Sequence, residues 1–149
     1  MNNYRESEGL SRVPYSCSLC TVADAHTEQL NNNPGLNGHD WEDCKYEGNM
    51  ACMGDKPREL TGYQGEGFEN YVGTLGYPSG SGGSMSPLQA LDEWKKSPEH
   101  NNAILNLDIW SPMEWKAMGA SVDRGFAVLW FGKEVDNKCG DQIGKPIPV

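Results

Sequence analysis

The residues whose types could form a reactive or metal-binding site are His39, Glu69 and His100. Two imidazoles and one carboxylate can hold a zinc ion with water in the open position, and the carboxylate can take a proton from that water. The spacing does not impose such a site, because the three are separated by 30 and 31 positions, unlike the i,i+4 histidines of a helical zinc motif. The three are candidate catalytic residues, with His39 and His100 as candidate ligands of zinc or another divalent cation.

The segment "SPEH" places His100 near the start of a predicted helix. Ser97 can cap this helix and Pro98 suits its first position. His100 then takes the third position, where a capping box has Glu or Gln. The partial positive charge of a helix N-terminus disfavours imidazolium, so we expect a neutral imidazole, which can be a metal ligand or a hydrogen-bonding group. The alternative is that His100 merely fills a capping niche.

His39 and Glu69 are predicted to lie in loops. "LNGHDW" suggests that His39 lies in a tight turn before an aromatic anchor, Trp41. In "GEGFENYVG", two glycines come before Glu69 and let the backbone approach neighbouring segments closely. The alternative for both is a solvated loop side chain. His26 falls on the apolar face of a predicted helix, where we expect a core histidine with satisfied hydrogen bonds.

The first helix that must position these residues is predicted over residues 18–32. Its inward side chains follow a 3.6-residue period: Leu19, Val22, Ala23, His26 and Leu30. "NNNPG" ends it. Residues 33–85 are rich in Gly, Asn and Asp, and we expect irregular structure with short helical turns there. Within them and just beyond, "PSGSGGSMS", residues 78–86, is predicted to be a flexible loop.

Three Ser-Pro pairs are predicted to begin helices. In "SPLQ", Ser86 can cap, the proline suits the first position, and Gln89 completes a capping box. The apolar stripe that follows consists of Leu88, Leu91 and Trp94. "SPEH" repeats the start at Ser97, and "SPME" at Ser111 is expected to give a single turn.

A hairpin is predicted near the C-terminus, with strands over residues 118–122 and 126–131 joined by Asp-Arg-Gly. The second strand, "FAVLWF", is apolar on both faces, so we expect it to be central and covered on both sides. Helices before a sheet covered on both faces indicate an α/β fold: a three-layer α-β-α sandwich with a small antiparallel sheet and irregular loops.

The chain of 149 residues is predicted to be a single domain over residues 1–149, with an N-terminal segment 1–16, a core 17–135 and an extended tail 136–149. The net charge of −9 argues against nucleic acid or an anionic membrane as the main partner, because both attract a basic face. No apolar run approaches the roughly 20 residues that span a bilayer. "MNNYRESEGL" lacks the apolar stretch of a signal peptide.

The chain has five cysteines, so at least one is free or bonded to another molecule if the rest pair; the disulfide expected between Cys44 and Cys52 indicates an oxidising compartment. Cys44 and Cys52 enclose a short loop, and we predict a disulfide between them. Cys17 and Cys20 form a C-x-x-C, a spacing found in redox and zinc sites. Neither a βαβ context nor a second such pair accompanies it, so we expect a structural role, with one of these two bonded to Cys139.

The segment "ALDEWKKSPEHNNAILN" resembles the W-x-x-S-P-x-H-x-x-x-I-L segment of bacterial members of the CAP superfamily. This superfamily comprises the cysteine-rich secretory proteins, antigen 5 and pathogenesis-related 1, also called SCP-like extracellular proteins. "VADAHTEQL" resembles its first helix, "GHDW" its first histidine motif, and "GFEN" its G-E-N motif with Phe68 inserted. "MGASVD…GFAVLWFGK" resembles its closing hairpin, so the resemblance covers nearly all of the chain.

The resemblance implies a secreted α-β-α sandwich with a wide central cleft that carries two histidines and two glutamates. His39 and His100 take the histidine places, and Glu69 takes the place of the first glutamate.

The second glutamate of eukaryotic members comes three residues after the helix tryptophan. Here Ser97 stands at that distance from Trp94, as is common in the bacterial branch. Glu93 and Glu99 are nearby, but neither matches the motif.

The resemblance favours a binding or interaction module, because members have been tied to sterols and fatty acids, divalent cations and cell-envelope partners. The expected ligand is therefore a lipid or sterol, or a cell-envelope ligand, and the expected state is a monomer or weak dimer. The alternative is a metal-dependent hydrolase, in which zinc on His39 and His100 lowers the pKa of a bound water towards about 7 and Glu69 takes its proton. The missing second carboxylate disfavours this alternative, and the sequence has no G-x-S-x-G elbow.

Overall fold

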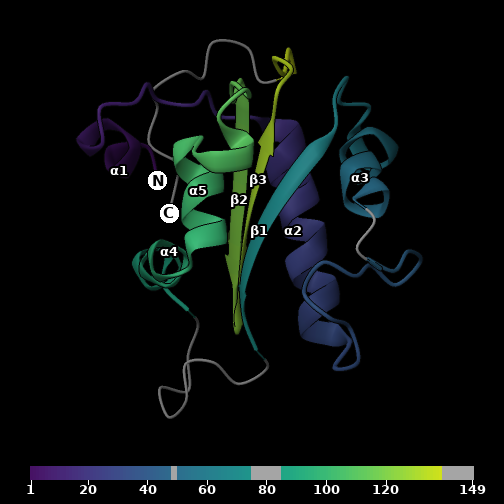
Figure 1. Cartoon of the computed structure of the whole chain (residues 1–149). Helices are drawn as coiled ribbons and strands as arrows, with labels where there is room; N and C mark the ends of the chain where they lie inside the picture. The colour runs from purple at the N-terminus through teal and green to yellow at the C-terminus, as the bar shows by residue number, and fades with distance from the viewer. Residues whose placement is uncertain (48–49, 75–84, 139–149) are drawn as a thin grey trace.

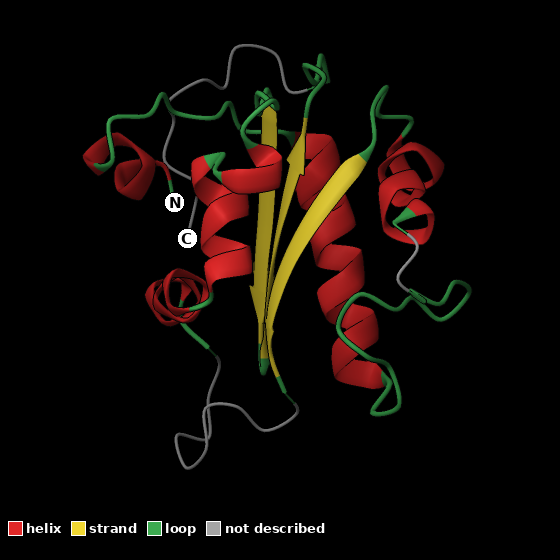
Figure 2. Cartoon of the chain, in the orientation of Figure 1, coloured by secondary structure: helices red, strands yellow, loops and turns green. Residues whose placement is uncertain are grey.

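The computed structural model describes residues 1–47, 50–74 and 85–138. They form three layers, with a three-stranded sheet between two helical layers (Figures 1 and 2). The elements, in chain order, are α1 (Asn2–Ser7), α2 (Cys17–Asn32), α3 (Ala51–Thr61), β1 (Gly67–Gly73), α4 (Pro87–Lys96), α5 (Pro98–Leu105), the 3-10 turn η1 (Asp108–Trp110), β2 (Ala117–Asp123) and β3 (Phe126–Gly132). The predicted α-β-α sandwich is confirmed.

The sheet has the order β1-β3-β2, and all its pairs are antiparallel. β3 is therefore central, and each of its residues is buried, as its two apolar faces predicted. β1 lies at one edge, where Phe68 pairs with Phe131 and Glu69 pairs with Trp130. Among the described residues no further strand pairs with the outer side of β1.

Two apolar cores flank the sheet, and the alternation of β3 divides its side chains between them. Leu129 and Phe131 pack with Trp94 and Ile104 beneath α4 and α5. Val128 and Trp130 belong to the other core, which includes Leu19, Val22 and Trp41 and lies beneath α2 and α3. Each fully buried large side chain contributes about 1.5–3 kcal/mol, so the two cores hold both helical layers firmly on the sheet.

The helix starts follow the predicted signals in two of three cases. Ser86 and Gln89 form a reciprocal capping box at α4, and Ser97 is the N-cap of α5. The third prediction is wrong: Ser111 starts no helix, and the short turn η1 precedes it. Leu88 is also misassigned, since it is 74% exposed while Ala90 and Trp94 form the buried face of α4.

The prediction of irregular structure over residues 33–85 is wrong for two segments, α3 and β1. α3 has no side-chain N-cap and contains Pro57, so its local signals are weak, and Gly62 ends it in a left-handed conformation with φ 74°. β1 owes its conformation to hydrogen bonding with β3, far away in the chain. The predicted loop of residues 78–86 lies outside the described residues up to residue 84, as does most of the tail.

The Cys44–Cys52 disulfide is confirmed. Cys17 is disulfide-bonded and Cys20 is free, so these two do not form the disulfide of a redox C-x-x-C. Cys139, the predicted partner of one of them, lies outside the described residues.

Candidate functional site

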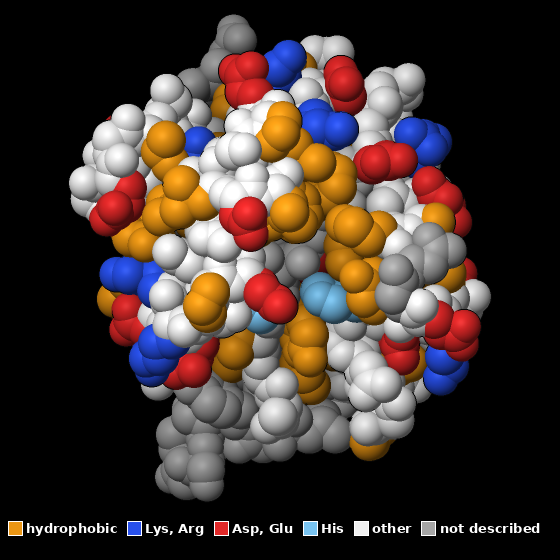
Figure 3. Space-filling view, in the orientation of Figure 1, with side chains coloured by type: hydrophobic (Ala, Val, Ile, Leu, Met, Phe, Trp, Pro, Cys, Tyr) orange, Lys and Arg blue, Asp and Glu red, His pale blue; other side chains and the backbone are white. Residues whose placement is uncertain are grey.

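A cleft crosses the edge strand β1 where the two helical layers stand apart. The cavity has a volume of about 380 Å³. Phe68, Glu69 and Asn70 of β1 form its floor, His39 belongs to the wall on the α3 side, and His100 belongs to the wall on the α5 side. Figure 3 shows histidine side chains near the centre of this hollowed face, with apolar and acidic side chains around them.

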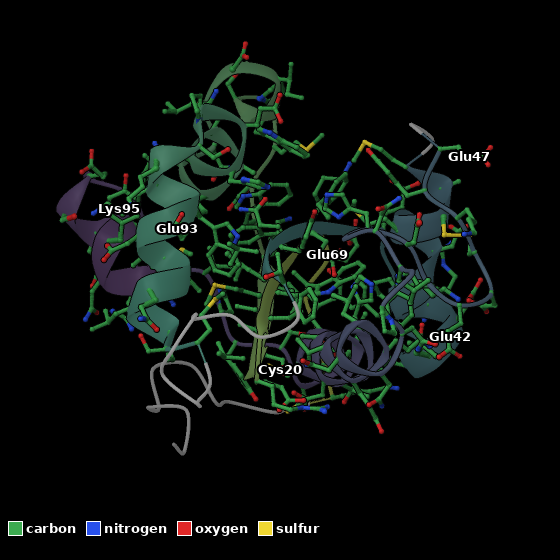
Figure 4. The ribbon with its side chains drawn as sticks, turned by 90° about the horizontal axis from the view of Figure 1, so that it is seen from below. Cys20, Glu42, Glu47, Glu69, Glu93 and Lys95 are labelled. Carbon is green, nitrogen blue, oxygen red and sulfur yellow. A yellow bond between two sulfur atoms is a disulfide. The ribbon has the colours of Figure 1, made fainter. Side chains whose placement is uncertain are left out.

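The strand β1 connects the two walls because successive side chains point to opposite faces of a sheet. Phe68 packs against Trp110 and Trp115 on the α5 side, with ring centres 5.5 and 5.4 Å away. Asn70 points to the same side, and its Nδ2 donates to the carbonyl of His100 at 3.2 Å. Glu69 points to the opposite side, towards α2 (Figure 4).

The carboxylate of Glu69 is fully buried and holds two imidazoles. Its Oε1 accepts from Nδ1 of His39 at 2.9 Å, and its Oε2 is bonded to Nδ1 of His26. Nε2 of His26 donates to the carbonyl of Asp40 at 2.9 Å. Nε2 of His26 thus carries a proton, and its other nitrogen, Nδ1, faces a carboxylate oxygen that can only accept. This geometry favours a protonated ring, that is, a buried imidazolium–carboxylate pair.

The surroundings of His26 agree with a protonated ring. Burial alone lowers the pKa of His26, but the charge and hydrogen bond of Glu69, helped by Asp40, outweigh burial and raise the pKa above its ordinary value of 6.5. The ring also stacks on Trp41, with centres 4.2 Å apart and planes at 9°. His26 is thus the satisfied core histidine that the sequence predicted, and its bond to Glu69 additionally makes it part of the cleft's support.

The loop that carries His39 is anchored at several points. The carbonyl of Asp40 is fixed by His26, and its carboxylate accepts from the backbone N–H of Tyr46 at 2.7 Å. Trp41 and Cys44 exchange backbone hydrogen bonds, and the Cys44–Cys52 disulfide ties the loop to α3. The loop therefore presents His39 from a fixed backbone.

The ring of His39 lies between two tyrosines. Its centre is 5.1 Å from Tyr46 and 5.0 Å from Tyr71. Gly38 allows this arrangement, because a Cβ there would lie 1.7 Å from the Tyr71 ring. The His39 side chain is 22% exposed. Within the described part of the chain no hydrogen bond reaches its Nε2, which remains available to a ligand in the cleft.

His100 is the third residue of α5, as the capping pattern predicted. Its Nδ1 bonds Ser97 Oγ at 2.8 Å, in place of the usual bond from the capping serine to the backbone. Burial lowers the pKa of His100, the charge of His39 lowers it further, and Glu99 opposes both. The imidazole is therefore neutral at pH 7, and its Nε2 has no hydrogen-bond partner among the described residues.

Sequence reasoning brought together three residues that do line one cavity, His39, Glu69 and His100; their functional roles remain predictions. It set Glu99 aside because that residue matches no motif, and it missed Asp108; both line the same cavity and are exposed. The signal for Glu99 was its place directly before His100 in the first turn of α5. Asp108 gave no such signal, because it reaches the cleft through the turn η1.

The donor set suits a divalent cation in part. The two free Nε2 atoms are zinc ligands by type, and their Nδ1 atoms are held by a carboxylate and a hydroxyl, an arrangement that orients metal-binding histidines. Glu69 uses both oxygens for histidines. Over the described ranges, no group of three or more His, Cys, Asp or Glu side chains is arranged to hold a metal ion. The two histidines could therefore supply at most part of a metal site, with water completing it, and metal binding stays a prediction.

A protein-family sequence model, described as the cysteine-rich secretory protein (CAP) family, matches residues 1–111, about three quarters of the chain. The chain belongs to the cysteine-rich secretory protein (CAP) family. No curated protein matches it.

Solved structures share the CAP fold at low sequence identity. An outer surface protein of Borrelia burgdorferi is 15% identical with a TM-score of 0.62, over 89% of this chain and 86% of that protein. An extracellular SCP-domain protein of Bacillus anthracis is 20% identical with a TM-score of 0.64, over 89% of this chain and 37% of that one. A cysteine-rich secretory protein of Staphylococcus aureus is 15% identical with a TM-score of 0.60, over 89% and 35%.

This CAP chain thus spans little more than a third of the length of the two longer structures, and the similarity to all three concerns the fold. In the described part of the chain, no helix is both long enough and apolar enough to cross a membrane.

Proposed function

We propose that this CAP chain is a secreted binding module whose cleft takes a small ligand, with His39 and His100 binding a divalent cation such as zinc. The observation that carries the proposal is that both histidines line one cavity while their Nδ1 atoms are held from behind. Ligand binding in the cleft requires no further group, whereas hydrolysis of a substrate would also require a side chain that acts as general acid or base.

The metal part of the proposal is supported by the state of the histidines. A metal ligand must be neutral, and the lowered pKa of His100 keeps it so at physiological pH. The bond from His39 to Glu69 fixes the tautomer that leaves Nε2 unprotonated. With two protein ligands, the bound cation would keep several water molecules and bind more weakly than in a structural site with four ligands.

The organic part is supported by the apolar wall. Phe68, Trp110 and Phe131 face the cavity, and a volume of about 380 Å³ lies within the range of small-molecule pockets. A lipid, a sterol or an apolar part of a cell-envelope molecule could fill this space.

A metal-dependent hydrolase is the second candidate, and the observation that favours it is Glu99. This exposed carboxylate lines the cleft beside His100 and could act as a general base. Glu69, the expected base, is less suited because both of its oxygens already accept hydrogen bonds. We place this candidate second because no group among the described residues is identified that would stabilise a developing oxyanion.

The test is a calorimetric zinc titration of the chelator-treated protein and of a His39→Ala/His100→Ala variant. The matched control is Glu28→Ala/Asp92→Ala, which removes two exposed side chains away from the cleft. We expect micromolar binding in the parent and the control and its loss in the histidine variant. Equal binding in all three would refute the paired-histidine site. Circular dichroism of each variant establishes that the fold is retained.

A further inference from the structure

The exposed carboxylates of the cleft face no lysine or arginine in its described lining. Glu99 and Asp108 line it and are exposed, and neither forms a salt bridge within the described ranges. The third carboxylate, Glu69, is paired with His26. Among the residues that the structure describes, no lysine or arginine lines the cavity. The ammonium of Lys133 lies 5.7 Å from the ring centre of Phe68 but is not part of the lining.

The exposed lining of the cleft also includes apolar side chains. Ile109 is 71% exposed and Met50 is 41% exposed, and both line the cavity, one beside α5 and the other beside α3. Such side chains gain free energy when an apolar body covers them. Trp110, next to Ile109, adds an aromatic face that attracts a cation as well as an apolar group.

We infer that this cleft selects a cationic amphiphile: an alkylammonium group held near Glu99 and Asp108, with its apolar chain lying between Ile109, Trp110 and Met50. The inference rests on the proposed function, because it specifies the organic ligand of the same cleft. Low-dielectric walls strengthen the field of the two unpaired carboxylates. A fatty-acid carboxylate would meet the same field as a repulsion, so anionic lipids are disfavoured.

The test compares three probes that share one alkyl chain: decyltrimethylammonium, decanoate and decanol. Binding is measured by calorimetry and by tryptophan fluorescence, in the presence of a chelator and below the micellar concentration. The carboxylates of Glu99 and Asp108 should attract the cationic probe and repel the anionic one. We therefore expect decyltrimethylammonium to bind about tenfold tighter than decanoate, with decanol between them.

The decisive variant is Glu99→Gln/Asp108→Asn, which keeps side-chain shape. Asn also tolerates the left-handed backbone of residue 108, where φ is 53°. We expect this variant to bind the three probes within about threefold of one another. Glu28→Gln/Asp92→Asn changes the net charge equally at exposed positions outside the cleft and should keep the tenfold preference.

A cleft-filling variant, Asn102→Trp, separates this inference from the proposed function. Asn102 lines the cavity on α5 and is half-buried, so a larger side chain there should abolish probe binding without removing core contacts. If all probes bind equally and Asn102→Trp abolishes binding, the organic-ligand cleft stands and the charge selection is wrong. If no probe binds, or if Asn102→Trp leaves binding unchanged, both are wrong. The zinc titration tests the metal site independently of these results.

Discussion

The buried group formed by His26, Glu69 and His39 gives the sharpest prediction for stability. Replacing Glu69 with Ala removes the carboxylate whose charge and hydrogen bond raise the pKa of His26, and it leaves Nδ1 of the buried ring without that partner while Nε2 stays bonded to the carbonyl of Asp40. Breaking a buried ion pair by removing one partner costs about 3–5 kcal/mol. For a chain of this size each kcal/mol corresponds to about 3 °C, so the midpoint of thermal unfolding should fall by about 10–15 °C.

Replacing Glu69 with Gln should cost much less. The amide can donate to Nδ1 of a neutral His26 and accept from Nδ1 of His39, so each hydrogen bond of the parent has a substitute. What disappears is the charge attraction, and we expect a loss of about 1–2 kcal/mol. The contrast between the two variants measures how much the carboxylate charge contributes beyond its hydrogen bonds.

The pH dependence gives the same comparison a second readout. The pKa of His26 is raised in the folded state above its ordinary value of 6.5. Its contribution is therefore fully present below pH 6.5 and is lost as the pH rises through the folded pKa. In Glu69→Gln this slope should vanish, because a neutral ring binds no extra proton on folding.

The assay is urea unfolding followed by tryptophan fluorescence from pH 5.5 to pH 9, with both variants beside the parent. The reasoning is refuted if Glu69→Gln is as destabilised as Glu69→Ala, or if it keeps the stability slope of the parent above pH 6.5. The first result would mean that the amide hydrogen bonds do not substitute for those of the carboxylate, and the second would mean that His26 is not held as an imidazolium by this carboxylate.

Three further predictions concern the position and state of the cleft histidines. Gly38→Ala should destabilise the protein by about 1–3 kcal/mol, because its Cβ would lie 1.7 Å from the Tyr71 ring. Thermal unfolding measures this loss, and Gly35→Ala is the control, since the Cβ added there meets no atom within 4 Å. Asn70→Ala removes the bond to the His100 carbonyl and should cost about 1 kcal/mol, and if α5 then shifts, zinc binding measured by calorimetry should weaken; unchanged stability would show that this bond is replaced by water. Because burial and His39 lower the pKa of His100 below 6.5, proton competition at His100 should weaken zinc binding only below pH 6.5, and a pH titration of the His100 ring with its midpoint above pH 6.5 would contradict this.

Local signals predicted much of the fold. The apolar period of α2, the capping box at Ser86 and the apolar run of β3 each depend on residues a few positions apart, and each was found. α3 and β1 were not predicted, because Pro57 and the glycines around residue 69 weaken the local patterns of these segments. Contacts with distant segments stabilise both elements instead. The prediction at Ser111 was wrong for the opposite reason: the Ser-Pro start signal is present there, but no helix follows it.

The candidate site divides in the same way. His39, Glu69 and His100 were found because short motifs mark them, and the position of His100 in its helix follows from Ser97 alone. The bond from His26 to Glu69 spans 43 positions and depends on which face of β1 meets α2. Glu99 was weighed and set aside because it matches no motif, yet it lines the cavity.

The sequence by itself determined the starts of α4 and α5, the central strand, the 44–52 disulfide and the family, because each rests on neighbouring side chains or on short motifs. Only the tertiary structure decided that His26 supports Glu69, that Glu69 has no free oxygen, and that Glu99 and Asp108 leave the cleft acidic. These facts arise where β1 passes between two helical layers. Burial and charge at such a place depend on which distant segments pack there, and spacing along the chain does not specify that.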